Sequence, residues 1–368
     1  MVLSLNDLKK LGGVKMKKSV KFTAFMMALI MLFSFAGCSG NTNTNEKNSD
    51  KDNSAKTDTI TVTDMKGRAV SVPKNTSENT VATTYGVVTP FFVTLNMSDR
   101  VLAATFKNKG FLRKVDEVII KAGDIGNVSL DAESLAKFAP DVYICKNDES
   151  DKLEVAESLG IPVIMINPET PEDVMEVYEL LGKLFGVEAR AAEINAYIRA
   201  QLDEISALTK NIPENEKKTA LVMGSELGRV AGNDMLQTIM LKLAGAKTVV
   251  DGITNNFIWV NIGTEKIFEL DPEYLFITSS NVLNYKVTDI TEDSAWSAMK
   301  AVKGGNVYKI PAKMDSWDMP GPGFVLAIYY MINTMYPDIY PDDKLQEKID
   351  AYYQFMYGKT FDGETIGY

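Results

Sequence analysis

The stretch ESLAKFAPDVYI at residues 133–144 is matched by EKIFELDPEYLF at residues 265–276. In both stretches a glutamate comes first, a proline stands seven residues later, and an acidic residue and an apolar run follow the proline. The two copies lie 132 residues apart. A proline closes a helix, and a short apolar run is typical of a buried strand. The repeat therefore predicts two lobes that share one helix-strand unit.

Further strands are expected on both sides of the first copy. Apolar runs at residues 101–104, 142–145 and 163–166 are separated by helix-compatible stretches, which predicts a mostly parallel sheet covered on both faces. Residues 59–64 and 68–73 instead alternate between apolar and polar, which predicts a hairpin. The fold class indicated by this order is α/β, with two Rossmann-like lobes.

One long helix is predicted between the lobes, at residues 188–210. Neither proline nor glycine interrupts this stretch, so the helix should be stiff. Its apolar residues recur at spacings of three and four, as on one face of a helix: Ile194, Ile198, Leu202, Ile205 and Leu208. We expect this helix to join the lobes and a ligand cleft to lie between them.

The N-terminal segment has the pattern of a secretion signal. Lys17, Lys18 and Lys21 precede an uncharged apolar run at residues 22–36. This run is shorter than the roughly 20 residues needed to cross a bilayer. The sequence FAGC at 35–38 resembles the lipobox of bacterial lipoproteins, in which the cysteine is acylated, although Phe replaces the usual Leu. An uncleaved membrane anchor is the alternative interpretation.

These observations predict the organisation of the whole chain. Residues 39–56 contain no aromatic and no branched aliphatic residue, so they should act as a flexible tether. Met16 is the expected start of translation, because residues 1–15 add nothing to the signal. The predicted parts are a signal peptide (1–37), Cys38 with its tether (38–57), an N-terminal lobe (58–170), linking helices (171–212), a C-terminal lobe (213–357) and a tail (358–368).

Composition excludes several kinds of protein. The chain has 39 Lys and Arg against 49 Asp and Glu, and this net charge of -10 argues against a nucleic-acid binder. Histidine is absent, which excludes Ser-His-Asp and Cys-His catalysis and imidazole-bound metals. The sequence GKT at 358–360 lacks the upstream glycine of a phosphate loop. We expect Cys145, in an apolar run, to be a buried inert thiol.

The order of motifs resembles that of the class III solute-binding proteins, the binding subunits of importers for ferric siderophores, haem and vitamin B12. The resemblance covers residues 58–357. It rests on TDMKGRAVSVP (63–73), the helix-strand motif at 130–144, AGND (231–234) with LAGA (243–246), residues 296–311 and WDMPGP (317–322). It implies a lipid-anchored monomer on the extracytoplasmic face of the cell membrane. Such a protein hands a small solute to an ABC permease homodimer with its ATPase subunits, and it has no catalytic residue, cofactor or resident metal.

Candidate ligand-binding residues come from the loops that follow the predicted strands, because ligands bind beyond the carboxyl ends of such strands. Lys146 and Thr278 occupy equivalent places in the repeat and should face each other across the cleft. Arg229 precedes a predicted helix start and could bind an anionic group of the solute. The alternative is that Arg229 is a solvated residue of a loop. The full set, in which the aromatic residues could instead be core, is Tyr85, Lys146, Asn147, Arg229, Trp259, Thr278, Ser279 and Trp317.

Glu133 and Glu265 are candidate contacts for the permease. They occupy equivalent positions near the starts of two predicted helices. The resemblance implies that one glutamate per lobe meets permease arginines. The alternative is that each glutamate only stabilises the first turn of its helix through the helix dipole.

The identity of the solute stays open at this stage. We rank ferric-siderophore-type chelates first, corrinoids second, and haem or an oxyanion such as molybdate after them. A secreted hydrolase that uses paired carboxylates and a surface adhesin are the alternatives from other classes. No pair of acidic residues at a diagnostic spacing supports the hydrolase.

Overall fold

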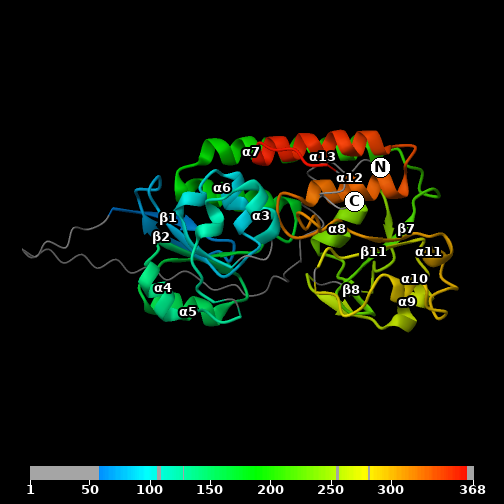
Figure 1. Ribbon diagram of the computed structural model, residues 1–368, viewed down its shortest axis with the longest axis horizontal. Coiled ribbons are helices and arrows are strands. Elements are labelled where there is room, and N and C mark those ends of the chain that lie inside the picture. The colour runs from blue at the N-terminus through cyan, green and yellow to red at the C-terminus, as the bar shows by residue number, and fades with distance from the viewer. Residues whose placement is uncertain (1–57, 106–108, 127, 254–256, 281, 363–368) are drawn as a thin grey trace, which may run out of the picture. The chain divides into compact units, whose positions relative to one another are not determined.

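The computed structural model describes residues 58–105, 109–126, 128–253, 257–280 and 282–362 (Figure 1). These residues belong to one compact unit, Thr57–Tyr368. The predicted signal peptide, Cys38 and the tether lie outside the described residues. None of the helices within these ranges has both the length and the apolar character required to cross a membrane.

The described chain opens with an antiparallel hairpin of β1 (Thr59–Thr63) and β2 (Ala69–Pro73). Val62 and Val72 are buried while their sequence neighbours are more exposed, as the alternation in the sequence predicts. The turn between the strands is made at Gly67, whose φ of 81° suits glycine.

The N-terminal lobe contains a four-stranded parallel sheet with the order β4-β3-β5-β6. Its strands are β3 (Val81–Thr83), β4 (Val101–Ala104), β5 (Val142–Lys146) and β6 (Val163–Ile166). The β5 and β6 strands are buried almost throughout, because helices and loops cover both faces of the sheet. The helices of this lobe are α2 (Thr89–Thr94), η1 (Ser98–Arg100), α3 (Lys109–Val115), η2 (Ile119–Lys121), α4 (Ala132–Phe138) and α5 (Ser150–Ser158).

Two helices then lead to the second lobe. Helix α6 (Pro171–Phe185) is capped by Thr170 at its start and by Gly186, with a φ of 64°, at its end. Helix α7 (Glu188–Thr209) follows and matches the long helix predicted from the sequence. Its predicted apolar face is the packed one: Ile194, Ile198 and Ile205 are buried, and Leu202 and Leu208 pack at the edge of the core.

The C-terminal lobe contains a mixed sheet with the order β10-β8-β7-β11-β12, and β9 (Lys247–Thr248) pairs with β7. Strands β7 (Thr219–Met223), β11 (Tyr274–Ile277) and β12 (Val307–Lys309) are parallel. Strands β8 (Arg229–Ala231) and β10 (Trp259–Asn261) form an antiparallel edge. The helices of this lobe are α8 (Leu236–Leu243), α9 (Thr264–Leu270), α10 (Thr288–Thr291), α11 (Lys300–Lys303) and α12 (Phe324–Met335).

Helix α13 (Asp342–Tyr357) runs alongside α7 in the opposite direction (Figure 1). The rings of Tyr197 and Phe355 stack with centroids 4.3 Å apart, and Lys348 Nζ lies 2.7 Å from a Glu204 oxygen. Tyr353 of α13 also packs edge-on against Phe111 of the first lobe. A second helix therefore reinforces the connection that α7 makes between the lobes.

The repeat read from the sequence extends to backbone conformation. Helices α4 and α9 end at Ala139 (φ 45°) and Asp271 (φ 42°), both left-handed and both directly before a proline. After the proline, Asp141 accepts hydrogen bonds from the backbone N–H and hydroxyl of Thr80, at 2.9 and 2.7 Å. Glu273 accepts the equivalent bonds from Thr219, at 2.9 and 3.2 Å. The same unit thus places β5 and β11 in the two lobes.

Candidate functional site

A cavity of about 490 Å³ lies between the two lobes. Much of its lining lies at or after the carboxyl ends of the parallel strands, where open α/β sheets bind their ligands. The first lobe contributes Thr84, Tyr85, Val87, Lys146, Glu149, Lys152 and Glu169. The second lobe contributes Ser225, Arg229, Met235, Gln237, Phe257, Ile258, Trp259, Thr278, Ser280, Met319 and Pro320.

The wall from the first lobe carries most of the charge. Lys152 and Glu149 form a largely buried ion pair at 2.6 Å, and the other Glu149 oxygen accepts a hydrogen bond from the Lys146 backbone N–H. The Lys146 ammonium lies 3.2 Å from Asp148. Burial raises the pKa of Tyr85, and the negative charge of Glu169 raises it further. The Tyr85 hydroxyl is therefore neutral at physiological pH.

Glu169 is the second acidic residue that lines the cavity, after Glu149. It follows β6 and directly precedes Thr170, the N-cap of α6, and only 7% of its surface is exposed. Burial raises the pKa of its carboxyl group, while the nearby charge of Lys146 opposes that shift.

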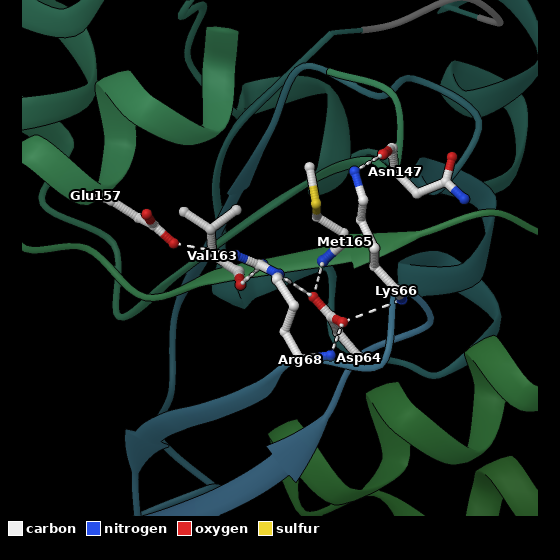
Figure 2. A network of polar contacts seen from close by, with 7 residues as sticks. All are labelled: Asp64, Lys66, Arg68, Asn147, Glu157, Val163 and Met165. Carbon is white, nitrogen blue, oxygen red and sulfur yellow. Dashed lines mark hydrogen bonds and ion pairs between the residues drawn. The ribbon is translucent and has the colours of Figure 1, made fainter. Parts of the chain in front are cut away.

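The hairpin turn holds this wall through a polar network around Asp64 (Figure 2). The buried Asp64 carboxylate accepts hydrogen bonds from the backbone N–H groups of Lys66, Arg68 and Met165 and forms an ion pair with the Arg68 guanidinium at 2.9 Å. The Arg68 guanidinium also donates a hydrogen bond to the Val163 carbonyl at 2.7 Å. The Lys66 ammonium donates to the Asn147 carbonyl at 2.8 Å, directly beside Lys146.

The wall from the second lobe is mostly apolar and aromatic. The Trp259 ring lies against Gly224, where an added Cβ would stand 2.8 Å from a ring carbon. Phe257 and Ile258, just before β10, are more than half exposed at 53% and 59%. Arg229 supplies the positive charge and lies 3.7 Å from Glu226.

The expected setting of Arg229 beside a helix start is wrong. Arg229 begins strand β8, which pairs antiparallel with β10, and the next helix, α8, begins at Leu236. The apolar residues Val230 and Ala231 are buried in this sheet, which explains the strand. Arg229 nevertheless lines the cavity.

A buried aspartate organises the second wall. Asp318 is fully buried, and its carboxylate accepts hydrogen bonds from the Thr278 hydroxyl at 2.7 Å and from the Ser279 backbone N–H and hydroxyl. Its backbone carbonyl accepts a hydrogen bond from the Gln237 amide at 2.7 Å. Asp318 thereby joins the end of β11, helix α8 and the segment that carries Met319.

Five of the eight predicted ligand-binding residues lie together on the cavity wall. They are Tyr85, Lys146, Arg229, Trp259 and Thr278.

The other three, Asn147, Ser279 and Trp317, are not among the residues that line the cavity. Asn147 offers its carbonyl to Lys66, and Ser279 points to Asp318 while the next residue, Ser280, lines the cavity. Trp317 is fully buried and donates its indole N–H to Tyr353 at 3.0 Å.

Several lining residues did not emerge from the sequence. Glu149, Lys152 and Glu169 look like ordinary surface charges in a sequence, although Glu169 follows β6 by only three residues and a wider window after that strand would include it. Phe257, Met235 and Met319 carry no distinguishing pattern.

The remaining candidates lie away from the cavity. Glu133 and Glu265 are exposed residues in the first turns of α4 and α9. Cys145 is buried in β5, and burial raises the pKa of its thiol to about 12, which agrees with the expected inert thiol. Within the described ranges, no group of three or more Cys, Asp or Glu residues is arranged to hold a metal ion.

Comparison with known proteins gives the family. Residues 81–314 match the periplasmic binding protein family. The chain belongs to this family. The class III resemblance seen in the sequence is thereby confirmed, and the chain is an ABC transporter substrate-binding protein. Its relatives are solute-binding transport proteins and not enzymes.

Three similar proteins illustrate the range of the family. The uncharacterized ABC transporter substrate-binding lipoprotein YvrC of Bacillus subtilis is 22% identical over 333 residues, covering 89% of this chain and 99% of its own. The molybdate-bound structure of the Haemophilus influenzae protein MolA is 19% identical with a TM-score of 0.71, covering 82% and 99%. Helicobacter pylori CeuE, in a Ni-His complex, is 19% identical with a TM-score of 0.68, covering 84% and 98%.

Proposed function

We propose that this substrate-binding protein captures an iron-siderophore-type metal chelate outside the cell membrane and delivers it to an ABC permease. The observation that carries this proposal is the contrast between the two walls of the cavity. One wall is charged and hydrogen-bonding, and the other presents Trp259, Phe257 and Met319. An organic chelate with a polar metal centre and an apolar periphery complements both walls.

The size and charge of the cavity support an organic solute. A volume of about 490 Å³ lies in the range of sites for drug-sized ligands, and a bare tetrahedral oxyanion would fill only a small part of it. In the first wall, Asp148 offsets the charge of Lys146, and Glu149 offsets that of Lys152. This wall therefore has no excess of positive charge that would attract a small dianion.

A chelate also fits the side chains that the chain can offer. The sequence contains no histidine, so imidazole cannot coordinate a metal. A transition metal is therefore expected to bind as a chelate, in which the organic molecule supplies the donor atoms. Lys146 and Arg229 can then contact anionic oxygens at the outside of the chelate.

An oxyanion is the second candidate solute. The molybdate-binding protein MolA is 22% identical to this chain over 279 residues, which favours molybdate among oxyanions. In that case Arg229 and Lys146 would be the natural contacts, since they are cationic groups from opposite walls.

The finer points of localisation and assembly belong to the same proposal. Acylation of Cys38 would hold a monomer at the extracytoplasmic face of the membrane, near a permease homodimer with its ATPase subunits. The name of YvrC as a lipoprotein supports this arrangement, as does the lipobox-like sequence at 35–38.

A thermal-shift screen of the purified full chain tests the solute. The panel contains a ferric trihydroxamate, a ferric catecholate, cobalamin, haem and molybdate. Ligand at a hundred times its dissociation constant stabilises by about 2.7 kcal/mol, which is readily detected. A shift with a ferric chelate supports the proposal, whereas a shift with molybdate alone supports the second candidate.

An arginine pair provides the matched control for this screen. Arg229→Gln should weaken binding by about tenfold or more, because a charge-assisted hydrogen bond is lost. The control is Arg199→Gln, at an exposed arginine of α7. Arg199 lies 3.6 Å from Glu179, much as Arg229 lies 3.7 Å from Glu226. Equal ligand-induced shifts in both variants would contradict a binding role for Arg229.

A further inference from the structure

Two polar groups of the first wall face the cavity without a partner in the protein. Within the described part of the chain, neither the Glu169 carboxyl nor the Tyr85 hydroxyl makes a hydrogen bond or ion pair; the Tyr85 backbone N–H is satisfied by Thr83. Both residues are more than nine-tenths buried, with exposures of 7% and 8%. Because both residues line the cavity, polar groups that the protein leaves unpaired there are available to a ligand group.

The charges around Glu169 indicate which kind of ligand group could bind there. Lys146 and Lys152, the cations of this wall, are engaged with Asp148 and Glu149. Asp173 and Asp148 add negative charge near Glu169, and Lys146 offsets part of it. An ionised Glu169 is therefore a buried carboxylate whose charge no close partner balances. Such a group is costly unless a cation meets it.

We propose that Glu169 and the Tyr85 hydroxyl together bind a positively charged, hydrogen-bond-donating group of the solute, such as a primary ammonium. Both oxygens accept hydrogen bonds, and the neutral Tyr85 hydroxyl can also donate to the solute. Arg229 and Trp259 stand on the opposite wall, so the solute would carry its ammonium toward the first lobe and its anionic or apolar part toward the second. This inference rests on the proposed function and specifies one end of the solute.

The first experiment needs no ligand. Thermal unfolding of the full chain is compared at pH 5 and pH 8 for wild type, Glu169→Gln and Glu176→Gln, the last an exposed residue of α6. If Glu169 lacks a structural partner, Glu169→Gln should melt a few degrees above wild type at pH 8 and lose that advantage at pH 5, where the carboxyl is closer to neutral. Glu176→Gln should match wild type at both. A lower melting temperature for Glu169→Gln at pH 8 would overturn the proposal.

The second experiment uses a matched pair of ligands. A ferric linear trihydroxamate with a free primary ammonium is compared with the same chelate N-acetylated. Wild type should bind the ammonium form about tenfold or more tightly, and Glu169→Gln should bind the two forms equally. Equal affinities in wild type, or discrimination that survives in Glu169→Gln, would overturn the proposal.

The outcomes separate this inference from the proposed function. If no ferric chelate of the panel binds but cobalamin, haem or molybdate does, the proposed chelate class fails. Glu169→Gln is then tested with that member, and an unchanged or higher affinity would overturn the ammonium site as well. If both chelates bind with equal affinity, the proposed function stands and the ammonium site alone fails.

Discussion

The carboxylate of Asp318 accepts hydrogen bonds from both the backbone N–H and the hydroxyl of Ser279, a residue at the carboxyl end of another element of the same lobe. Asp318 is fully buried, and burial raises the pKa of its carboxyl group against the lowering effect of these hydrogen bonds. Its neighbour Met319 lines the cavity, and so does Thr278, the neighbour of Ser279. This contact therefore sets the position of two cavity residues from within the scaffold.

Loss of this carboxylate should destabilise the protein. Asp318→Ala leaves the Thr278 and Ser279 donors unsatisfied in a buried place, and we expect a loss of about 3 kcal/mol in the free energy of unfolding. Urea denaturation measures the change. Asp338→Ala, at an exposed position after α12, is the control and should stay close to wild type. Equal midpoints for the two variants would contradict the structural role of Asp318.

The position of the Trp259 ring depends on the small size of Gly224. A Cβ at this position would lie 2.8 Å from a carbon of the indole ring, so Gly224→Ala should push the ring away from its position in the cavity wall. We expect the tryptophan fluorescence of the free protein to change and ligand affinity to fall. Trp296 and Trp317 are buried elsewhere and should contribute equally to both spectra. An unchanged spectrum would show that the wall tolerates the methyl group.

The hairpin should influence the cavity through Lys66. Lys66→Met removes the hydrogen bond to the Asn147 carbonyl, so hydrogen exchange should accelerate in the segment 146–152. The free energy of unfolding should fall by only about 1 kcal/mol, as expected for one exposed hydrogen bond. Lys74→Met, which removes an exposed pair with Asp58 in the same hairpin, is the control. The same exchange pattern in both variants would contradict a specific effect of Lys66.

The sequence repeat predicted the framework of the fold well because it marks local structure. The end of a helix in a left-handed residue before a proline is determined by a few neighbouring residues. Ala139 and Asp271 both end their helices in this way. The long helix could likewise be predicted from its apolar spacing. The second bridging helix, α13, could not be placed beside α7, because its contacts join residues far apart in the chain.

The residues that line the cavity could be predicted only where they lie at or just after the end of a strand. Lys146 ends β5 and Thr278 directly follows β11, in equivalent places of the repeat, and both line the cavity. Ser279 and Ser280 differ by one position, but side chains alternate in an extended chain, so only Ser280 lines the cavity. Trp317 lies in a turn-rich segment, but it is fully buried and hydrogen-bonded to Tyr353, a partner that no local pattern reveals.

Protonation of Asp315 should control stability near neutral pH. This carboxyl group is buried among Tyr178, Tyr352, Tyr353 and Tyr357, and burial raises its pKa from an ordinary 3.8 to about 7, against a hydrogen bond from the Ser316 backbone. The folded state thus holds a proton that the unfolded state releases between these values. The contribution of Asp315 to stability is therefore fully present below about pH 4 and is lost as the pH rises to about 7, by about 4 kcal/mol in order of magnitude.

Asp315→Asn isolates this contribution from that of other acidic groups. The difference in unfolding free energy between the variant and wild type should grow in favour of the variant from pH 4 to pH 7 and then level off. Urea denaturation at a series of pH values measures it. Parallel profiles for the two proteins would contradict the raised pKa of Asp315.

The positions of Glu133 and Glu265 allow contact with a two-fold symmetric partner. Both are exposed in the first turns of equivalent helices, α4 and α9. Figure 1 places these helices on the same side of the two lobes, away from α7 and α13. Paired residues on one face suit a permease homodimer that offers the same surface twice. The helix dipole also favours a glutamate in a first turn, by about 0.3–1 kcal/mol, and needs no partner.

A double charge reversal distinguishes docking from a helix-start role. Glu133→Arg with Glu265→Arg should leave the fold and the ligand affinity nearly unchanged, because both residues are exposed and outside the cavity. Uptake in cells should nevertheless be lost, since positive charges would then face the permease arginines that the family resemblance implies. Glu176→Arg with Glu347→Arg reverses two exposed glutamates on α6 and α13 and should preserve uptake. Wild-type uptake by a folded and normally abundant Glu133→Arg, Glu265→Arg protein would show that these glutamates serve only their own helices.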